Sequence, residues 1–336
     1  MTSTKLWGSG GLDPRVSPFS AKQGTTPIKP PLLLTQPLIP SARAALDAAF
    51  EVHTLYDAAD REDLLVRIAP SIRAIAGGHA PAEFIARFPR LEIIAGPGVG
   101  YDGIDIAAAK QRGIRVTNTP DVLNDAVAEL TIALMLALAR QVPQADAFVR
   151  AGHWPNATFA PSVELTGRTV GILGLGRIGK EIARRAQAMK MRVVYHGRHA
   201  QPREPYTFYA DLTEMAREAD WLVVIAPGGA GTEAIVSRAV LAALGPQGRL
   251  VNMARGSLVD EAALIEMLGT GALGGAALDV FADEPRVPEA LFGLPNVVLS
   301  PHQGSHTTET REAMGALLVA NLKAHFAGAP LLTPVA

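Results

Sequence analysis

Three side chains in the second half of the sequence have the types that acid–base chemistry beside a carboxylate needs. Arg255 follows the apolar run LVNMA, Glu284 lies in LDVFADEP, and His302 follows VVLSP. Arginine is a permanent cation that binds carboxylates, histidine exchanges a proton near neutral pH, and an acidic side chain can orient an imidazole. Together the three form a suitable set for reducing the carbonyl group of a 2-oxo acid.

Each of these residues, taken alone, also has a plainer interpretation. His302 fits an ordinary loop residue, Arg255 a cation at the start of a helix, and Glu284 part of a turn. His302 and His306 stand four apart and could share a helix face as metal ligands. No third ligand follows with suitable spacing, so the sequence predicts no metal site.

The strands that precede these residues must position them. The second half of the chain alternates apolar segments with helical patterns, and its predicted strands are TVGILG, MRVVYH, ADWLVVIA, GRLVNMA and GGAALDVF, with a further buried strand just before His302. Repeated strand and helix favour a parallel sheet with helices on both faces. Because the carboxyl ends of parallel strands share one edge, side chains just past them gather at one crevice.

The first half of the chain shows the same alternation. Its predicted strands are LLLTQ, IRAIAG, LEIIAG and GIRVTN, and helices are expected over residues 41–50 and PAEFIARF. Apolar residues at helical spacing predict one long helix from about Asp121 to Ala151. The predicted fold class is α/β, with two doubly wound parallel-sheet (Rossmann-like) domains and an active-site cleft between them.

Length and composition agree with two globular domains. The chain has 336 residues, 48% hydrophobic and 19% charged, with a formal net charge of −1 and no cysteine. The charge offers no attraction to nucleic acid or an anionic membrane. The longest apolar run, residues 132–139, is far shorter than the roughly 20 residues that span a bilayer. Residues 1–29 are expected to be a mobile extension without a signal peptide, which points to the cytoplasm.

A glycine-rich turn follows the strand TVGIL. The sequence GLGRIG places Gly174, Gly176 and Gly179 between that strand and a helix beginning at Arg177 and Ile178. The first glycine permits a tight turn, the second lets the backbone approach a pyrophosphate, and the third lets helix pack on strand. The helix N-terminus adds unpaired N–H groups. We predict a dinucleotide site rather than a nucleotide-triphosphate loop, because glutamate follows the GK pair where that loop needs Ser or Thr.

The position about 20 residues past these glycines bears on the choice of cofactor. Enzymes that use NAD carry an acid there, which binds the adenosine ribose, but this chain has Gly197 and Arg198. Glycine removes the carboxylate and its bulk, and the arginine can pair with a 2′-phosphate. We therefore predict NADP(H) as the preferred cofactor, with NAD(H) also usable. The alternative is that Arg198 is a solvated charge at a strand end.

Five motifs, in this order, resemble the D-isomer-specific 2-hydroxyacid dehydrogenases over about residues 32–332: GPGVGYDGIDIAAAKQRGIRVTNTP, ILGLGRIG, VNMARGSLVDEAAL, AALDVFADEP and LSPHQGSHTTETR. Within that family the likeness is to the glyoxylate/hydroxypyruvate reductases, which tend to carry Gly or Ser followed by Arg at the YHGR position and to prefer NADPH. The resemblance implies reduction of a small 2-oxo acid, such as glyoxylate, hydroxypyruvate or a 2-keto sugar acid.

The resemblance also implies roles for the site residues. His302 would be the general acid that protonates the carbonyl oxygen, and Glu284 would fix the tautomer of its imidazole. Arg255 would bind the substrate carboxylate and polarise the carbonyl group. The backbone N–H groups of Val99 and Gly100 would complete carboxylate binding.

Three further positions take their roles from the resemblance alone. Asp279 would lie near the nicotinamide carboxamide, and Thr232 near the cofactor phosphates or ribose. Trp154 would either reach the active site of a partner subunit or lie buried at a dimer interface. A homodimer is likewise implied only by the family.

The family's substrate-binding domain is discontinuous. Its pattern implies a substrate-binding domain at residues 30–122 plus 307–336, and a dinucleotide-binding domain at residues 123–306. Gln303, His306 and the GGAGTE turn depart from the common pattern, which leaves the preferred substrate open.

Two other functions on the same fold stay open at this point. Formate dehydrogenases replace the glutamate that pairs with histidine by glutamine, so Glu284 argues against that activity. A dinucleotide-sensing, corepressor-like binding protein would need a peptide-docking surface, which the sequence does not reveal.

Overall fold

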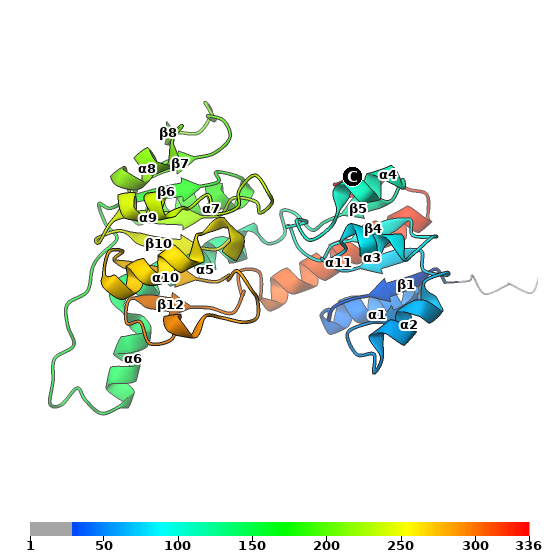
Figure 1. Cartoon of the computed structure of the whole chain (residues 1–336), viewed down its shortest axis with the longest axis horizontal. Helices are drawn as coiled ribbons and strands as arrows, with labels where there is room; N and C mark the ends of the chain where they lie inside the picture. The colour runs from blue at the N-terminus through cyan, green and yellow to red at the C-terminus, as the bar shows by residue number, and fades with distance from the viewer. Residues whose placement is uncertain (1–28, 336) are drawn as a thin grey trace, which may run out of the picture.

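The structure is a computed structural model that describes residues 29–335. The mobile extension predicted for residues 1–29 lies, except for its last residue, outside the described residues. The described chain forms two lobes, each built on its own parallel sheet with helices on both faces (Figure 1). The predicted α/β fold class with two doubly wound domains is confirmed.

The first lobe contains a five-stranded sheet in the order β2-β1-β3-β4-β5, with all neighbours parallel. Leu32, Leu33 and Leu34 of β1 are fully buried, as expected for a strand covered on both faces. The strands are β1 (Pro31–Leu34), β2 (Glu51–Thr54), β3 (Ala74–Ala76), β4 (Ile93–Ala95) and β5 (Arg115–Thr117). The helices are α2 (Arg61–Ile68), α3 (Ala82–Ala86) and α4 (Ile106–Gln111) on one face, and α1 (Pro40–Ala49) and α11 (Thr308–Phe326) on the other.

The second lobe contains a seven-stranded sheet in the order β12-β11-β10-β9-β6-β7-β8, again all parallel. Its strands are β6 (Thr169–Leu173), β7 (Arg192–His196), β8 (Thr207–Tyr209), β9 (Trp221–Val224), β10 (Arg249–Asn252), β11 (Gly275–Leu278) and β12 (Val297–Leu299). One face packs on α8 (Leu212–Glu218), α9 (Arg238–Leu244) and α10 (Glu261–Thr270), and the other on α5 (Asn124–Arg140) and α7 (Arg177–Ala188). Single 3₁₀ turns occur at Gly256–Leu258 and Glu289–Leu291.

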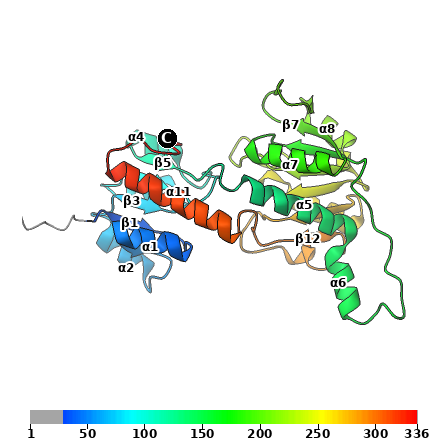
Figure 2. The same ribbon diagram turned by 180° about the vertical axis from the view of Figure 1, so that it is seen from behind.

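Two helices near the domain boundaries connect the lobes. Leu123 precedes α5, which packs in the second lobe, and Thr307 caps α11, whose side chains join the core of the first lobe. Figure 2 shows α11 in front of the first sheet, extending towards the second lobe. The end of the chain pairs back onto β5 through a bridge from Thr117 to Pro334. The C-terminal segment therefore lies with the N-terminal sheet. The domain bounds, residues 30–122 plus 307–336 and residues 123–306, stay a prediction.

The long helix predicted from Asp121 to Ala151 is wrong as a single element. The chain forms α5 and then α6 (Val142–Arg150), with Gln141 between them in the left-handed region at φ 53°. Pro143 lacks the N–H that a continuous helix would need and its ring would clash with the preceding turn. Within residues 29–335 no single helix is long and apolar enough to cross a membrane; only α5 and α6 together reach that length, and they are bent by 59°.

Two strands escaped the sequence analysis, and both lie at sheet edges. β2 is an outer strand of the first sheet and β8 of the second. Their side chains are exposed or half-buried, so neither strand has the continuous apolar run that marks an inner parallel strand.

Candidate active site

Three neighbouring strands carry the acid–base residues to one place. Arg255, Glu284 and His302 follow β10, β11 and β12, which are adjacent in the second sheet. All three line one cavity of about 300 Å³, together with Gly100 and Asp102 from the first lobe. The cavity is therefore formed by both lobes, at the carboxyl ends of the second sheet's strands.

His302 and Glu284 form a hydrogen-bonded pair. The imidazole Nδ1 lies 2.7 Å from Glu284 Oε2, and Glu284 Oε1 accepts a hydrogen bond from the Phe281 N–H at 3.1 Å. Because Nδ1 is used in this way, Nε2 is the nitrogen left to meet a ligand. The His302 side chain is 48% exposed, so it is accessible from the cavity. A carboxylate on one nitrogen and an open second nitrogen is the arrangement of an oriented proton donor.

Asp279 holds the loop on which His302 stands. Its side chain is almost fully buried, with Oδ1 accepting from Ser300 Oγ at 2.6 Å and from the Gln303 N–H at 2.7 Å. Its Oδ2 accepts from the Gly304 N–H at 2.8 Å. These bonds bracket His302, whose φ of 54° is a conformation that a non-glycine residue seldom adopts without such support. The nicotinamide contact expected for Asp279 stays a prediction, since its hydrogen bonds here all serve this loop.

Arg255 forms a bidentate ion pair with Asp102 of the other lobe. Its Nε and Nη2 each lie 3.0 Å from a carboxylate oxygen, and Nη1 donates to the Ala254 carbonyl at 2.6 Å. A guanidinium has five N–H groups, so two remain for a ligand. Burial disfavours the charge on Asp102, but hydrogen bonds and attraction from Arg255 outweigh it and hold the pKa of Asp102 below its usual value.

The glycine-rich loop before Asp102 lies against the same arginine. A Cβ placed on Gly100 would overlap Arg255 Nη2, so only glycine permits this approach of backbone to guanidinium. Val99 is half-buried and does not line the cavity, but its carbonyl accepts from Asn118 Nδ2 at 2.9 Å and is thereby fixed. The structure thus brings Gly100 and Arg255 together, with Val99 next to them in sequence.

The glycine turn after β6 has the geometry that a dinucleotide site requires. Gly174 has φ 103°, and a Cβ there would lie 2.8 Å from the Ala226 backbone. A Cβ on Gly179 would overlap the Gly174 carbonyl oxygen, so α7 packs at glycine distance. Gly176 is the N-cap of α7, and no atom lies within 4 Å of the position that a Cβ would take there. This open space leaves room for a pyrophosphate at the helix N-terminus.

The loop after β7 lies beside this turn. β6 and β7 are adjacent, and Gln201 Nε2 donates to the Leu175 carbonyl at 2.7 Å, which ties the two loops together. The space around Gly197 is open, and Arg198 is exposed. An arginine is therefore present at the loop where the adenosine ribose of a bound dinucleotide would lie.

Three other expected cofactor residues occupy the surrounding loops. Arg177 is exposed and forms an ion pair with Asp121 at 2.9 Å. Ile178 is half-buried against the core of the second lobe. The Thr232 hydroxyl lies 2.9 Å from the Pro227 carbonyl, so it stabilises the turn after β9. These contacts place all three in loops or helix turns of the second lobe without showing a cofactor contact.

Comparisons with known proteins agree with this site. The family model for the D-isomer specific 2-hydroxyacid dehydrogenase, NAD binding domain, matches residues 132–304. The chain belongs to the D-isomer-specific 2-hydroxyacid dehydrogenase family. The resemblance stated from the motifs is thereby confirmed: the protein is an enzyme, a dehydrogenase with a nicotinamide-dinucleotide domain.

Relatives match the chain over nearly its whole length. It is 46% identical to a hydroxyphenylpyruvate reductase of Plectranthus scutellarioides over 90% of this chain and 98% of the relative. It is also 46% identical to a glyoxylate/hydroxypyruvate reductase of Arabidopsis thaliana, with the same coverage. Among solved structures, the NADPH-dependent glyoxylate/hydroxypyruvate reductase from Sinorhizobium meliloti, in complex with NADP and malonate, is 45% identical, with a TM-score of 0.87 over 92% of this chain and 97% of that one.

Trp154 is not part of this dehydrogenase's own cavity. It follows α6 in the sequence, and its side chain is 69% exposed. The helix α6 itself projects from the second lobe (Figure 1). Within one chain, the structure does not bring Trp154 together with Arg255 and His302. A contact with a partner's active site stays a prediction.

Sequence reasoning missed the residues that hold the site residues in place. Asp102 stands inside the quoted motif GPGVGYDGID, yet nothing local indicates that it pairs with Arg255. Asn252, at the end of β10, is buried and bonds to both the Ala254 N–H and the Arg255 carbonyl. Its signal was a polar residue inside an otherwise apolar strand, which usually marks a satisfied structural bond.

Proposed function

We propose that this dehydrogenase uses NADPH to reduce small 2-oxo acids, such as glyoxylate, hydroxypyruvate or a 2-keto sugar acid, to D-2-hydroxy acids. The observation that carries the proposal is the placement of Arg255, the His302–Glu284 pair and Gly100 around one cavity. The names of the relatives, which are reductases of such acids, support the same reaction.

Different residues of the chain bind the substrate and donate the proton in this reaction. The two remaining N–H donors of Arg255, with the backbone of Val99 and Gly100, would bind the substrate carboxylate. This places the neighbouring carbonyl oxygen towards His302, whose Nε2 donates the proton. Glu284 holds the imidazole in place through its contact with Nδ1. NADPH, when bound, supplies the hydride, and the proton from His302 neutralises the oxygen as that hydride arrives.

The preference for NADPH over NADH is also part of the proposal. Gly197 offers no carboxylate to a ribose 2′-hydroxyl and leaves open space, while the exposed Arg198 offers a cation for a 2′-phosphate. The NADP bound to the Sinorhizobium meliloti relative supports this choice.

A homodimer forms the last part of the proposal. The arm formed by α6 and the following loop exposes the apolar side chains Val142, Val149 and Trp154 at 52%, 53% and 69%. Exposed apolar groups on a projecting arm are typical of a subunit contact. The cytoplasmic location stays a prediction from the sequence.

Turnover measurements test the reaction. Oxidation of NADPH should be followed with glyoxylate, hydroxypyruvate and 2-ketogluconate, with formate and NADP⁺ as the test of the formate dehydrogenase alternative. A chain that binds NADPH but reduces no acid would be a sensor rather than a reductase.

Two variants test the roles of the residues. His302→Gln should lower kcat about 100- to 10,000-fold, the usual contribution of a general acid, and leave the Kd for NADPH within about threefold. Arg255→Ala should lower kcat/KM comparably. The control is His53→Gln, a histidine of β2 outside the cavity. Normal turnover in His302→Gln would show that His302 is not the general acid.

A further inference from the structure

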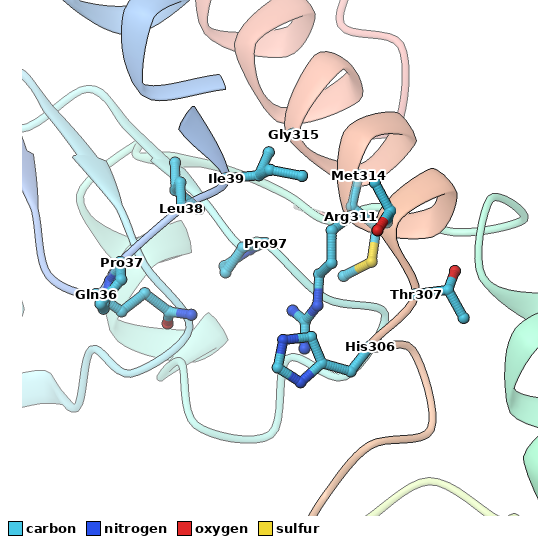
Figure 3. A pocket seen from close by; sticks show the side chains of 11 residues that line it. Gln36, Pro37, Leu38, Ile39, Pro97, His306, Thr307, Arg311, Met314 and Gly315 are labelled. Carbon is cyan, nitrogen blue, oxygen red and sulfur yellow. The ribbon is translucent and has the colours of Figure 1, made fainter. Parts of the chain in front are cut away.

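A second cavity lies at the junction of the lobes, on the first lobe's side. It has a volume of about 600 Å³ and shares no lining residue with the catalytic cavity. Its walls come from residues 36–39 after β1, from Pro97, and from the segment 306–315 that leads into α11 (Figure 3). None of the residues that line this second cavity has a role in the proposed reaction.

The second cavity contains one arginine, Arg311, whose charge is half-buried. Figure 3 shows it reaching from α11 into the cavity. Its Nε is buried and has no hydrogen-bond partner. Among residues 29–335 no acidic side chain forms an ion pair with it, and burial is the only influence on its pKa. Burial lowers the pKa of Arg311, with no nearby anion to offset the lost hydration. A half-buried cation without a partner is costly, which indicates that an anion from outside the chain completes it.

The remaining lining suits a carboxylate. Among the described residues no acidic side chain lines the second cavity, whereas the polar side chains Gln36, His306 and Thr307 do. The cavity also meets the first turn of α11, a helix of 19 residues whose N-terminus carries positive potential. Of the acids near Arg311, Glu312 is engaged by Ser41 Oγ at 2.5 Å and does not line the cavity. A planar guanidinium among neutral polar groups fits the two oxygens of a carboxylate.

The two cavities flank the same loops. Gln36 Oε1 accepts a hydrogen bond from the Gly78 N–H at 3.3 Å, and Gly78 lines the catalytic cavity. His306 follows His302 by four residues, which span at most about 14 Å and are folded back by a turn. Pro97 lies three residues before Gly100 in the same loop. The loops that line the two cavities are therefore connected by a hydrogen bond and by short stretches of chain.

We propose that the second cavity is a carboxylate-binding subsite in which Arg311 binds the distal carboxylate of a 2-oxo diacid whose 2-oxo acid end lies against Arg255. A free carboxylate anion has the same chemistry and is the other source of such a ligand. The diacid form rests on the proposed reductase function, whereas binding of a free carboxylate does not.

The first experiment compares substrates of equal chain length. We would measure kcat/KM for 2-oxoglutarate and for 2-oxopentanoate, which lacks the second carboxylate, with glyoxylate as a reference. Arg311→Met, which keeps the apolar stem, should lower the diacid-to-monoacid ratio about 10- to 100-fold, the range for one charge-assisted hydrogen bond. Arg311→Lys should restore part of the ratio. Arg238→Met, which removes a surface arginine paired with Glu266, should leave it unchanged.

The second experiment observes Arg311 directly and needs no turnover. In nitrogen–proton NMR spectra the Nε–H signal that disappears in Arg311→Met would be titrated with acetate and with 2-oxoglutarate. If the Arg311 signal shifts with 2-oxoglutarate but not with acetate, and Arg311→Met lowers the diacid-to-monoacid ratio, then the ligand of Arg311 is the distal carboxylate of the substrate. If the Arg311 signal shifts with acetate, and still does so in Arg255→Ala, then the ligand of Arg311 is a free carboxylate anion.

The proposal is overturned if neither acid moves the Arg311 signal and Arg311→Met leaves the substrate ratio unchanged. That outcome, with glyoxylate still reduced, leaves the proposed function intact. Failure of the proposed function has a different signature: the wild-type chain reduces no 2-oxo acid, while the acetate titration still reports on the subsite.

Discussion

Replacing Asp279 by asparagine is the sharpest test of how the site is built. The carboxylate accepts three hydrogen bonds, at 2.6, 2.7 and 2.8 Å, from Ser300, Gln303 and Gly304. Asparagine keeps the shape but has one accepting oxygen. Its best orientation retains the two bonds at one oxygen and turns its NH₂ group against the Gly304 N–H, donor facing donor.

The magnitude follows from these contacts. The lost charge-assisted bond is worth about 1.5 to 3 kcal/mol, and each of the two remaining bonds weakens by about 0.5 to 1 kcal/mol when its acceptor becomes neutral. Asp279→Asn should therefore lower the free energy of unfolding by about 2.5 to 5 kcal/mol. Because the loop carries His302, a displacement of about 1 Å should also lower kcat about 100-fold.

The assay is urea denaturation of wild type and variant, combined with kcat for glyoxylate and the Kd for NADPH. Asp260→Asn is the matched control, because Asp260 caps α10 by accepting from the Ala263 N–H and asparagine caps equally well. The control should lose less than about 1 kcal/mol.

One result would refute the reasoning. If Asp279→Asn keeps the stability of the control but raises the Kd for NADPH, then Asp279 serves the nicotinamide and not the His302 loop.

Two further predictions concern charges. Arg198→Ala should raise the KM for NADPH about five- to tenfold, as expected for an exposed charge pair worth about 1 kcal/mol, and leave the KM for NADH unchanged; an equal response of both cofactors would exclude a 2′-phosphate contact. The second concerns the ion pair of Asp102 and Arg255, whose side chains are 31% and 33% exposed. The pKa of Asp102 is lowered from 3.8, so the pair stabilises the folded chain above that pH and the contribution is lost as pH falls through the lower folded-state value. Asp102→Asn should cost about 1 kcal/mol in urea denaturation at pH 7 and nothing in strong acid; a cost that persists in acid would show that the charge is not its cause.

Much of the site is readable in short windows of sequence. Buried parallel strands appear as apolar runs such as LLL in β1, and the residues after β10, β11 and β12 must gather because parallel strands end at one edge. The glycine turn is equally local, since Gly174 at φ 103° is a backbone requirement that only one residue type meets easily. For these reasons the sequence alone predicts that Arg255, Glu284 and His302 gather at one crevice, each just after its own strand.

Other features were decided only when distant segments met. Arg255 and Asp102 stand 153 residues apart and come from different lobes, so no local pattern indicates their pairing. The side chain of Asp279 accepts hydrogen bonds from two N–H groups of the loop at 300–304. Leaving these N–H groups unpaired is costly because the folded structure buries them, and burial depends on the tertiary structure. Arg311 looks like any helix arginine until the fold places it, without an acid, beside a cavity. Backbone preference and apolar periodicity act over a few residues, whereas charge pairing depends on which surfaces the folded lobes bring together.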